Sequence, residues 1–160
     1  MNDLTSRALE LQHAAHELMY LGMDGEPGYS DTFCRLNKEV LVKSDSLFSA
    51  QSSDVEEEAN LCLALLMGYN ATIYDDGDKE QKKQMVLNRI CLVLEQLPAS
   101  LLKVRLLTYT YGEVYEEVLF QEAYAIIEGW NKDNLTSEQT VIIEELKNIE
   151  ENPYPFEEVE

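Results

Sequence analysis

Residues 55–73 read VEEEANLCLALLMGYNATI, and this stretch decides the fold. Its apolar residues at positions 55, 59, 62, 66, 69 and 73 follow steps of three and four, the period of one face of an α-helix. Asp54 followed by Glu57 is a typical signal for the start of a helix. Residues 61–67 are apolar on every side of this helix, so we expect it at the centre of the fold.

Two amphipathic helices are predicted before this segment. One face of the first helix comprises Leu4, Ala8, Leu11, Ala15 and Leu18. This helix is expected to end at Gly22, because glycine readily adopts the left-handed conformation that closes a helix. Ser30 is expected to cap the second helix, whose predicted buried residues are Phe33, Leu36, Val40, Leu41, Leu47 and Phe48.

Four helices are predicted after it. Asp78 with Gln81 starts the fourth helix, and Pro98 closes that helix or opens the next. A fifth helix over residues 99–111 and a sixth over residues 114–130 are separated at Gly112, where a kink is the alternative. A seventh helix follows the capping box formed by Thr136 and Gln139.

The pattern as a whole predicts an all-α fold, because no stretch shows the sustained alternation of a strand. We expect a single-domain antiparallel bundle of about six or seven helices over residues 1–150, and an acidic tail with prolines and aromatics over residues 151–160. LLMGYNATIYDD from Leu65 and LLTYTYGEVYEE from Leu106 resemble each other. They would suit helix-pair repeats, although two amphipathic helices with similar tyrosines explain them more simply.

The chain is strongly acidic. Its 160 residues include 31 acidic and 12 basic ones, which gives a formal net charge of −19. Residues 113–160 form the acidic pole, with only Lys132 and Lys147 as cations. This charge opposes direct binding to nucleic acid and favours a protein partner with a basic surface. The main basic cluster is interpreted as a solvated helix face: Lys79, Lys82, Lys83, Arg89, Lys103 and Arg105.

Cysteine usage and hydropathy predict a cytoplasmic protein. Cys34, Cys62 and Cys91 are interpreted as buried thiols in a reducing compartment. The longest apolar run, residues 61–67, is too short to span a bilayer, and the N-terminus lacks the features of a signal peptide. We therefore expect no membrane partner.

The residues that could perform chemistry form no recognisable catalytic motif. His13 and His16 stand three apart with Glu17 beside them, an order that differs from zinc-protease helices. We expect no enzymatic activity, no cofactor and no metal. A metal-dependent hydrolase that uses these histidines and a helical-repeat adaptor that binds peptides are the two alternatives. The sequence does not indicate whether the protein forms a homo-oligomer.

The loop YLGMDGEPGYSD, residues 20–31, is predicted to be a compact acidic connection. Pro27 and Gly28 suit the central positions of a type II turn, and Asp24, Glu26 and Asp31 would repel a phosphate. This loop and the tail both place apolar groups on irregular backbone, so we expect them to contact a partner. The candidate residues are Met23, Asp24, Gly25, Glu26, Pro27, Tyr29, Tyr154 and Phe156.

Four blocks of sequence carry a family resemblance: AHELMYLGMDGEPGYSD (15–31), LCLALLMGYNATIYDDGDKE (61–80), LPASLLK (97–103) and EENPYPFEEVE (150–160). With these blocks the chain resembles the UpxZ family over nearly its full length. UpxZ proteins are encoded in capsular polysaccharide loci of gut anaerobes, beside NusG-like antitermination factors called UpxY. The family is understood to inhibit the antitermination factors of other loci, and no catalytic residues are assigned to it.

The resemblance implies a transcription regulator that binds a UpxY-type factor and limits concurrent expression of capsular polysaccharide operons. The composition is compatible with this role, because an acidic surface complements a basic one and tyrosines suit protein interfaces. The middle helices hold most of the tyrosines: Tyr69, Tyr74, Tyr109, Tyr111, Tyr115 and Tyr124. Our hypothesis is that an acidic, tyrosine-bearing surface binds a basic face of the factor and blocks its access to RNA polymerase or nucleic acid.

Overall fold

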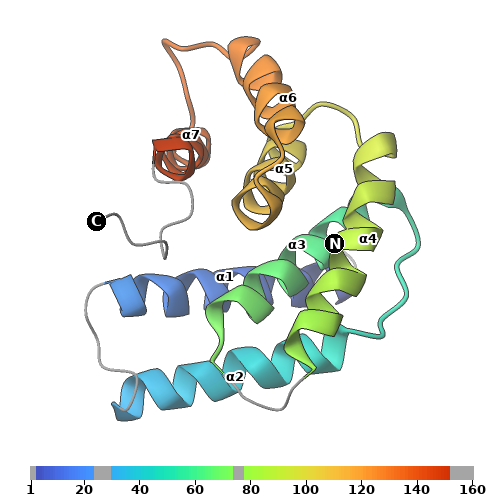
Figure 1. Ribbon diagram of the computed structural model, residues 1–160, viewed down its shortest axis with the longest axis vertical. Helices are drawn as coiled ribbons and strands as arrows, with labels where there is room; N and C mark the ends of the chain where they lie inside the picture. Colours follow the sequence, from blue (N-terminus) through green and yellow to red (C-terminus); the bar gives the residue numbers. More distant parts are fainter. Residues whose placement is uncertain (1–2, 24–29, 74–77, 152–160) are drawn as a thin grey trace. The chain divides into compact units, whose positions relative to one another are not determined.

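The computed structural model describes residues 3–23, 30–73 and 78–151. These ranges contain seven helices and no strand, which confirms the predicted all-α class. The helices are α1 (Asp3–Met23), α2 (Asp31–Leu47), α3 (Val55–Ala71), α4 (Lys79–Gln96), α5 (Leu101–Val114), α6 (Glu117–Glu128) and α7 (Ser137–Glu151) (Figure 1). None of the described helices is long and apolar enough to cross a membrane.

The chain divides into two compact units, Met1–Leu97 and Pro98–Glu160. The first unit contains α1 to α4, and the second contains α5 to α7. The single domain expected over residues 1–150, with a separate tail after it, stays a prediction.

α3 is the central helix of the first unit, as expected. It contacts α1, α2 and α4, and every side chain from Leu61 to Met67 is at most 1% exposed. Burial of apolar surface on all sides of one helix is the main stabilising contribution in this unit. Ile73, the last residue of the predicted apolar face, is 66% exposed because α3 already ends at Ala71 and the chain turns extended at Thr72.

α1 and α2 lie side by side and run in opposite directions (Figure 1). Four of the five apolar residues predicted for α1 are buried: Ala8, Leu11, Ala15 and Leu18. The predicted end of α1 is wrong by one residue, because the helix runs through Gly22 to Met23. A single glycine costs only about 1 kcal/mol in a helix, so α1 can continue through it.

Helix starts follow the predicted capping residues at three of four positions. In each confirmed case a side-chain oxygen accepts a backbone N–H three residues later: Ser30 from Phe33 (3.1 Å), Asp54 from Glu57 (2.8 Å) and Thr136 from Gln139 (3.0 Å). Asp78 precedes α4 but makes no such bond. Its carboxylate instead lies 3.2 Å from the Nζ of Lys82, one turn into the helix.

In the second unit, α5 packs against both α6 and α7. The predicted break at Gly112 is wrong, since this glycine lies inside α5. The break occurs at Tyr115, which adopts a left-handed conformation with φ 55° and ψ 35°. Gly112 serves packing instead, because a Cβ added there would lie 3.2 Å from the Cδ1 of Ile149 on α7. This close approach lets α7 lie against α5.

Candidate functional site

The residues expected to contact a partner fall mostly outside the described ranges. Met23 is the last residue of α1. The other seven lie outside the described residues: Asp24, Gly25, Glu26, Pro27, Tyr29, Tyr154 and Phe156. The partner contact at the glycine loop and the tail therefore stays a prediction.

His13 and His16 lie on α1, where they do not converge with further metal ligands. His13 lines a hollow of about 600 Å³ together with Glu10 and Glu17 of α1 and Lys43 of α2. The ring of His16 contacts the ring of Tyr20 in a tilted arrangement, with ring centroids 4.5 Å apart. The described part of the chain contains no group of three or more histidine, cysteine or acidic side chains that could hold a metal ion. The hydrolase alternative thus gains no support.

Only one of the three cysteines matches the expectation of a buried thiol. Cys62 on α3 is buried, whereas Cys34 on α2 and Cys91 on α4 are exposed. Cys34 and Cys91 lie on the outer faces of their helices. The prediction was wrong for these two because apolar residues at helical spacing stand near them in the sequence. Burial, together with the charge of Glu58, raises the pKa of the Cys62 thiol, so this thiol stays protonated and unreactive.

Two basic residues of α4, Lys82 and Arg89, are bound to neighbouring helices, so the interpretation of a solvated face is wrong for these two, whereas Lys83 pairs with Glu80 on α4 itself. Lys82 Nζ lies 3.1 Å from Asp45 Oδ1 on α2, and the hydroxyl of Tyr69 on α3 donates to the same oxygen at 2.8 Å. Burial lowers the pKa of Lys82, but hydrogen bonds and charges from Asp45 and Asp78 raise it on balance. Three helices of the first unit are therefore joined at one carboxylate.

Arg89 on α4 makes a second polar link, to Glu58 on α3. The guanidinium donates to both carboxylate oxygens, at 2.8 and 2.9 Å, and both side chains are less than one third exposed. Burial raises the pKa of Glu58, but the hydrogen bonds from Arg89 and Ser52 lower it on balance. The pair lines two hollows of about 420 and 320 Å³ beside residues 48–55.

Spacing along α4 contained the signal for both links. Lys82 and Arg89 stand in register with Val86 and Val93, on the helix face that is buried. A cation in an apolar register is expected to find a carboxylate on the opposite helix. The identity of that carboxylate depends on how α2 and α3 pack, which spacing along α4 does not contain.

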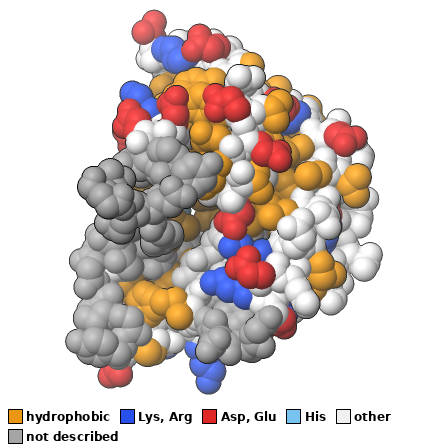
Figure 2. Space-filling model, viewed as in Figure 1, with side chains coloured by type: hydrophobic (Ala, Val, Ile, Leu, Met, Phe, Trp, Pro, Cys, Tyr) orange, Lys and Arg blue, Asp and Glu red, His pale blue; other side chains and the backbone are white. Residues whose placement is uncertain are grey.

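The second unit holds an acidic surface. Figure 2 shows carboxylates beside apolar side chains over α6 and the segment that follows it. Seven exposed glutamates at α6, at its N-cap and on α7 have no ion pair with a described residue, and we call them the acidic surface: Glu116, Glu117, Glu128, Glu138, Glu144, Glu150 and Glu151. Glu122 differs from them, because its carboxylate lies 2.8 Å from the Nζ of Lys103. Carboxylates left without cations favour a positively charged partner.

Aromatic rings extend from α5 to α6 next to this surface. Tyr111 contacts both Tyr115 and Phe120, and Phe120 contacts Tyr124, with centroid distances of 5.8, 5.4 and 4.7 Å. Burial and the nearby charges of Glu150, Glu151 and Glu128 raise the pKa of the Tyr124 hydroxyl. Tyr124 thus remains a neutral hydrogen-bond donor among carboxylates, which brings part of the predicted tyrosine-bearing acidic surface together.

Comparison with known proteins gives two matches. Residues 8–112 match the UpxZ family of transcription anti-terminator antagonists. The whole chain is similar to the crystal structure of the transcription anti-terminator antagonist UpxZ from Bacteroides uniformis, with 67% sequence identity, 99% of each chain covered and a TM-score of 0.88. No curated protein matches the sequence. The family match ends before the acidic surface begins, and the solved structure extends over it.

Proposed function

This chain belongs to the UpxZ family of transcription anti-terminator antagonists, and from that premise we propose that it acts by direct protein binding. The partner is a NusG-like antitermination factor of the UpxY type, encoded at another capsular polysaccharide locus. Binding would keep the factor from RNA polymerase or nucleic acid in the cytoplasm, so that one capsule operon at a time is fully transcribed. The protein is a regulator in this proposal and needs no cofactor.

The acidic surface is the observation that supports direct binding best. Its carboxylates are exposed, and no described cation pairs with them. Their negative electrostatic potential therefore acts on an approaching partner without being neutralised by a neighbouring cation. Such a field speeds encounter with a basic surface and orients it. The rings around Tyr124 add area that a partner could cover without desolvating a charge. The glycine loop and the tail remain further candidate contacts.

A salt titration of the purified complex tests the electrostatic part of this proposal. We expect the association rate to fall by at least about tenfold between about 50 mM and about 500 mM NaCl, because salt screens exposed charges. The triple variant Glu117→Gln, Glu128→Gln and Glu144→Gln should show a smaller change. Association that is equally fast at both salt concentrations would exclude steering by the acidic surface.

A further inference from the structure

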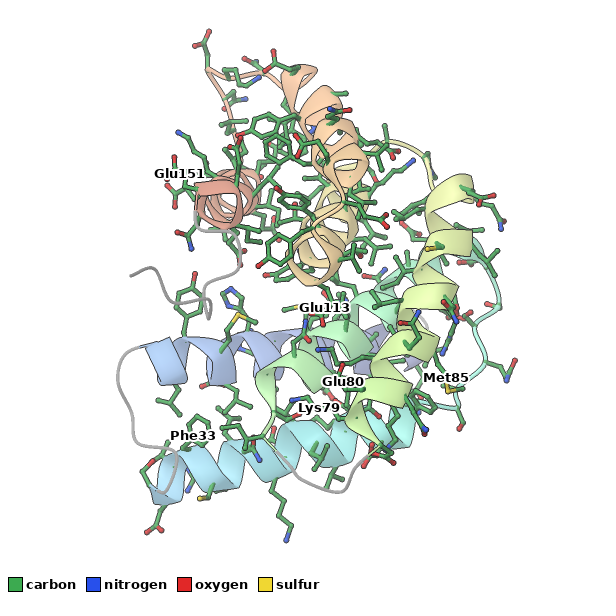
Figure 3. All side chains as sticks on the ribbon, in the orientation of Figure 1. Phe33, Lys79, Glu80, Met85, Glu113 and Glu151 are labelled. Carbon is green, nitrogen blue, oxygen red and sulfur yellow. The ribbon has the colours of Figure 1, made fainter. Side chains whose placement is uncertain are left out.

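The outer face of α4 between residues 81 and 92 is unusual among the described helix faces, because it has no exposed charged side chain. Between residues 81 and 92 six side chains are exposed, and we call them the uncharged stripe: Gln81, Gln84, Met85, Asn88, Cys91 and Leu92. Met85 and Leu92 are 54% and 63% exposed, and Met85 projects from the side of α4 that faces away from α3 (Figure 3). Gln84 and Asn88 bond to each other through their side-chain amides at 3.0 Å. More than three helical turns are thus free of exposed charge.

Other exposed helix faces in the described ranges do not share this property. Charged residues recur at least every two turns on the outer faces of α1, α2, α6 and α7. Solubility explains a charged face but gives no reason for an uncharged one with two large apolar side chains. Protein interfaces, by contrast, are depleted of charge at their centre and enriched in methionine.

A hollow continues the uncharged stripe at Leu92. It has a volume of about 320 Å³, and Val55, Leu92 and Val93 form its apolar part. Asp54 and Arg89 also line it, and the charge of Arg89 is already neutralised by Glu58. A hollow of this size next to exposed apolar side chains can take an apolar side chain from a partner.

The charges around the uncharged stripe indicate which kind of partner can bind there. Glu80 precedes it and lies 4.0 Å from the Nζ of Lys83. Glu95 follows it and Asp54 borders the hollow, and neither has an ion pair with a described residue, so these two carboxylates give the apolar centre an acidic rim. A second copy of this chain would bring the same carboxylates against these and would repel, since each copy has a formal net charge of −19. A protein surface with an apolar centre and basic residues around it fits instead.

We propose that the uncharged stripe and its hollow are the surface that anchors the antitermination factor, with an apolar side chain of the factor in the hollow and basic residues against the rim. This inference rests on the proposed function and deepens it. The acidic surface of the second unit accelerates encounter, whereas the stripe of the first unit holds the complex together after encounter. Apolar contact that excludes water accounts for most of the affinity at such interfaces.

Matched substitutions test the anchor. Leu92→Glu places a charge in the stripe, and Val42→Glu places the same charge on α2, where Val42 is 57% exposed. We expect Leu92→Glu to weaken binding of the purified factor at least about tenfold at low and high salt, and Val42→Glu to change it less than about twofold. Both variants should keep the helical circular dichroism and unfolding midpoint of the wild type, since both sites are exposed.

Thiol protection in the unaltered chain gives a second readout. Cys91 lies within the uncharged stripe and is exposed. Cys34 is exposed on α2, outside the stripe, so its alkylation rate serves as the internal control for the reagent. In the complex, alkylation of Cys91 by iodoacetamide should slow at least about tenfold, as expected for a contact that excludes water. If Cys91 in the complex reacts as fast as in the free chain, the uncharged stripe is not the binding surface. The same conclusion follows if Leu92→Glu binds the factor as tightly as Val42→Glu. In both cases the proposed function stands. A wild-type chain that binds no factor would overturn both the anchor and the proposed function.

Discussion

At the scale of single residues, Gly68 permits the close approach of α2 and α3. A Cβ at this position would overlap the Oγ of Ser44, which is buried and donates a hydrogen bond to Val40 O at 2.8 Å. We expect Gly68→Ala to lower the free energy of unfolding by about 1–3 kcal/mol, because overpacking forces the two helices apart. Urea denaturation followed by circular dichroism measures this change.

Two controls separate overpacking from a general effect of removing glycine. At Gly129 the nearest atom to an added Cβ is the carbonyl oxygen of Ile126 at 3.4 Å, so Gly129→Ala should change stability by less than about 0.5 kcal/mol. Adding Ser44→Ala to Gly68→Ala removes the overlapping oxygen and should restore part of the loss. A Gly68→Ala variant as stable as Gly129→Ala would contradict the packing described for α2 and α3.

The ion pair between Arg89 and Glu58 predicts a pH-dependent contribution to stability. The pKa of Glu58 is lower in the folded protein than in the unfolded chain. The pair therefore stabilises the fold above the unfolded pKa of a glutamate, near 4.3, and this stabilisation is lost as pH falls through the lower, folded pKa. Arg89→Ala should cost about 1–2 kcal/mol at pH 7 and clearly less at about pH 3.

Paired urea titrations of the wild type and Arg89→Ala at the two pH values provide the measurement. The difference between the two proteins matters, because acid also relieves the repulsion of a chain with net charge −19 and so changes the stability of both. Arg89→Lys is the matched control, since it keeps the charge and loses the two-pronged geometry. A cost of Arg89→Ala that is equal at both pH values would show that the pair contributes packing alone.

At the scale of elements, Tyr115 sets the break between α5 and α6. Its φ of 55° is a conformation in which a Cβ meets steric hindrance and glycine does not. We expect Tyr115→Gly to be more stable than Tyr115→Ala by about 1 kcal/mol, although glycine is the poorer helix former. The comparison with alanine cancels the loss of the ring contact with Tyr111, which both variants share. Thermal unfolding of the two variants in parallel measures which is more stable. A higher unfolding midpoint for Tyr115→Ala than for Tyr115→Gly would contradict a left-handed conformation at Tyr115.

Helix number and most helix starts were predictable from sequence, because caps and apolar spacing act within one or two turns. Ser30, Asp54 and Thr136 each bond a residue three positions away, so neighbouring sequence contains the whole signal. Gly112 misled the prediction because its role is tertiary, namely contact with Ile149 on α7. Asp78 misled it because Lys82 offered the carboxylate a charged partner.

At the scale of the whole molecule, the charge distribution along the sequence predicted the acidic surface but not the uncharged stripe. The exposed carboxylates of α6 and α7 follow from the charge count of residues 113–160. The uncharged stripe of α4 was missed, because its meaning depends on which residues are exposed and on the hollow beside Leu92. The same holds for the partly exposed polar link at Asp45, in which the partners come from three helices.

Direct binding to the antitermination factor is the central claim, and sedimentation velocity of the two purified proteins without nucleic acid or RNA polymerase tests it most directly. At micromolar concentrations and low salt we predict a faster-sedimenting complex of one chain with one NusG-like factor of another capsular polysaccharide locus. Leu92→Glu should reduce this boundary, and Val42→Glu should leave it unchanged. Two independent boundaries at every concentration, from proteins that are folded and active, would contradict antagonism by direct protein binding.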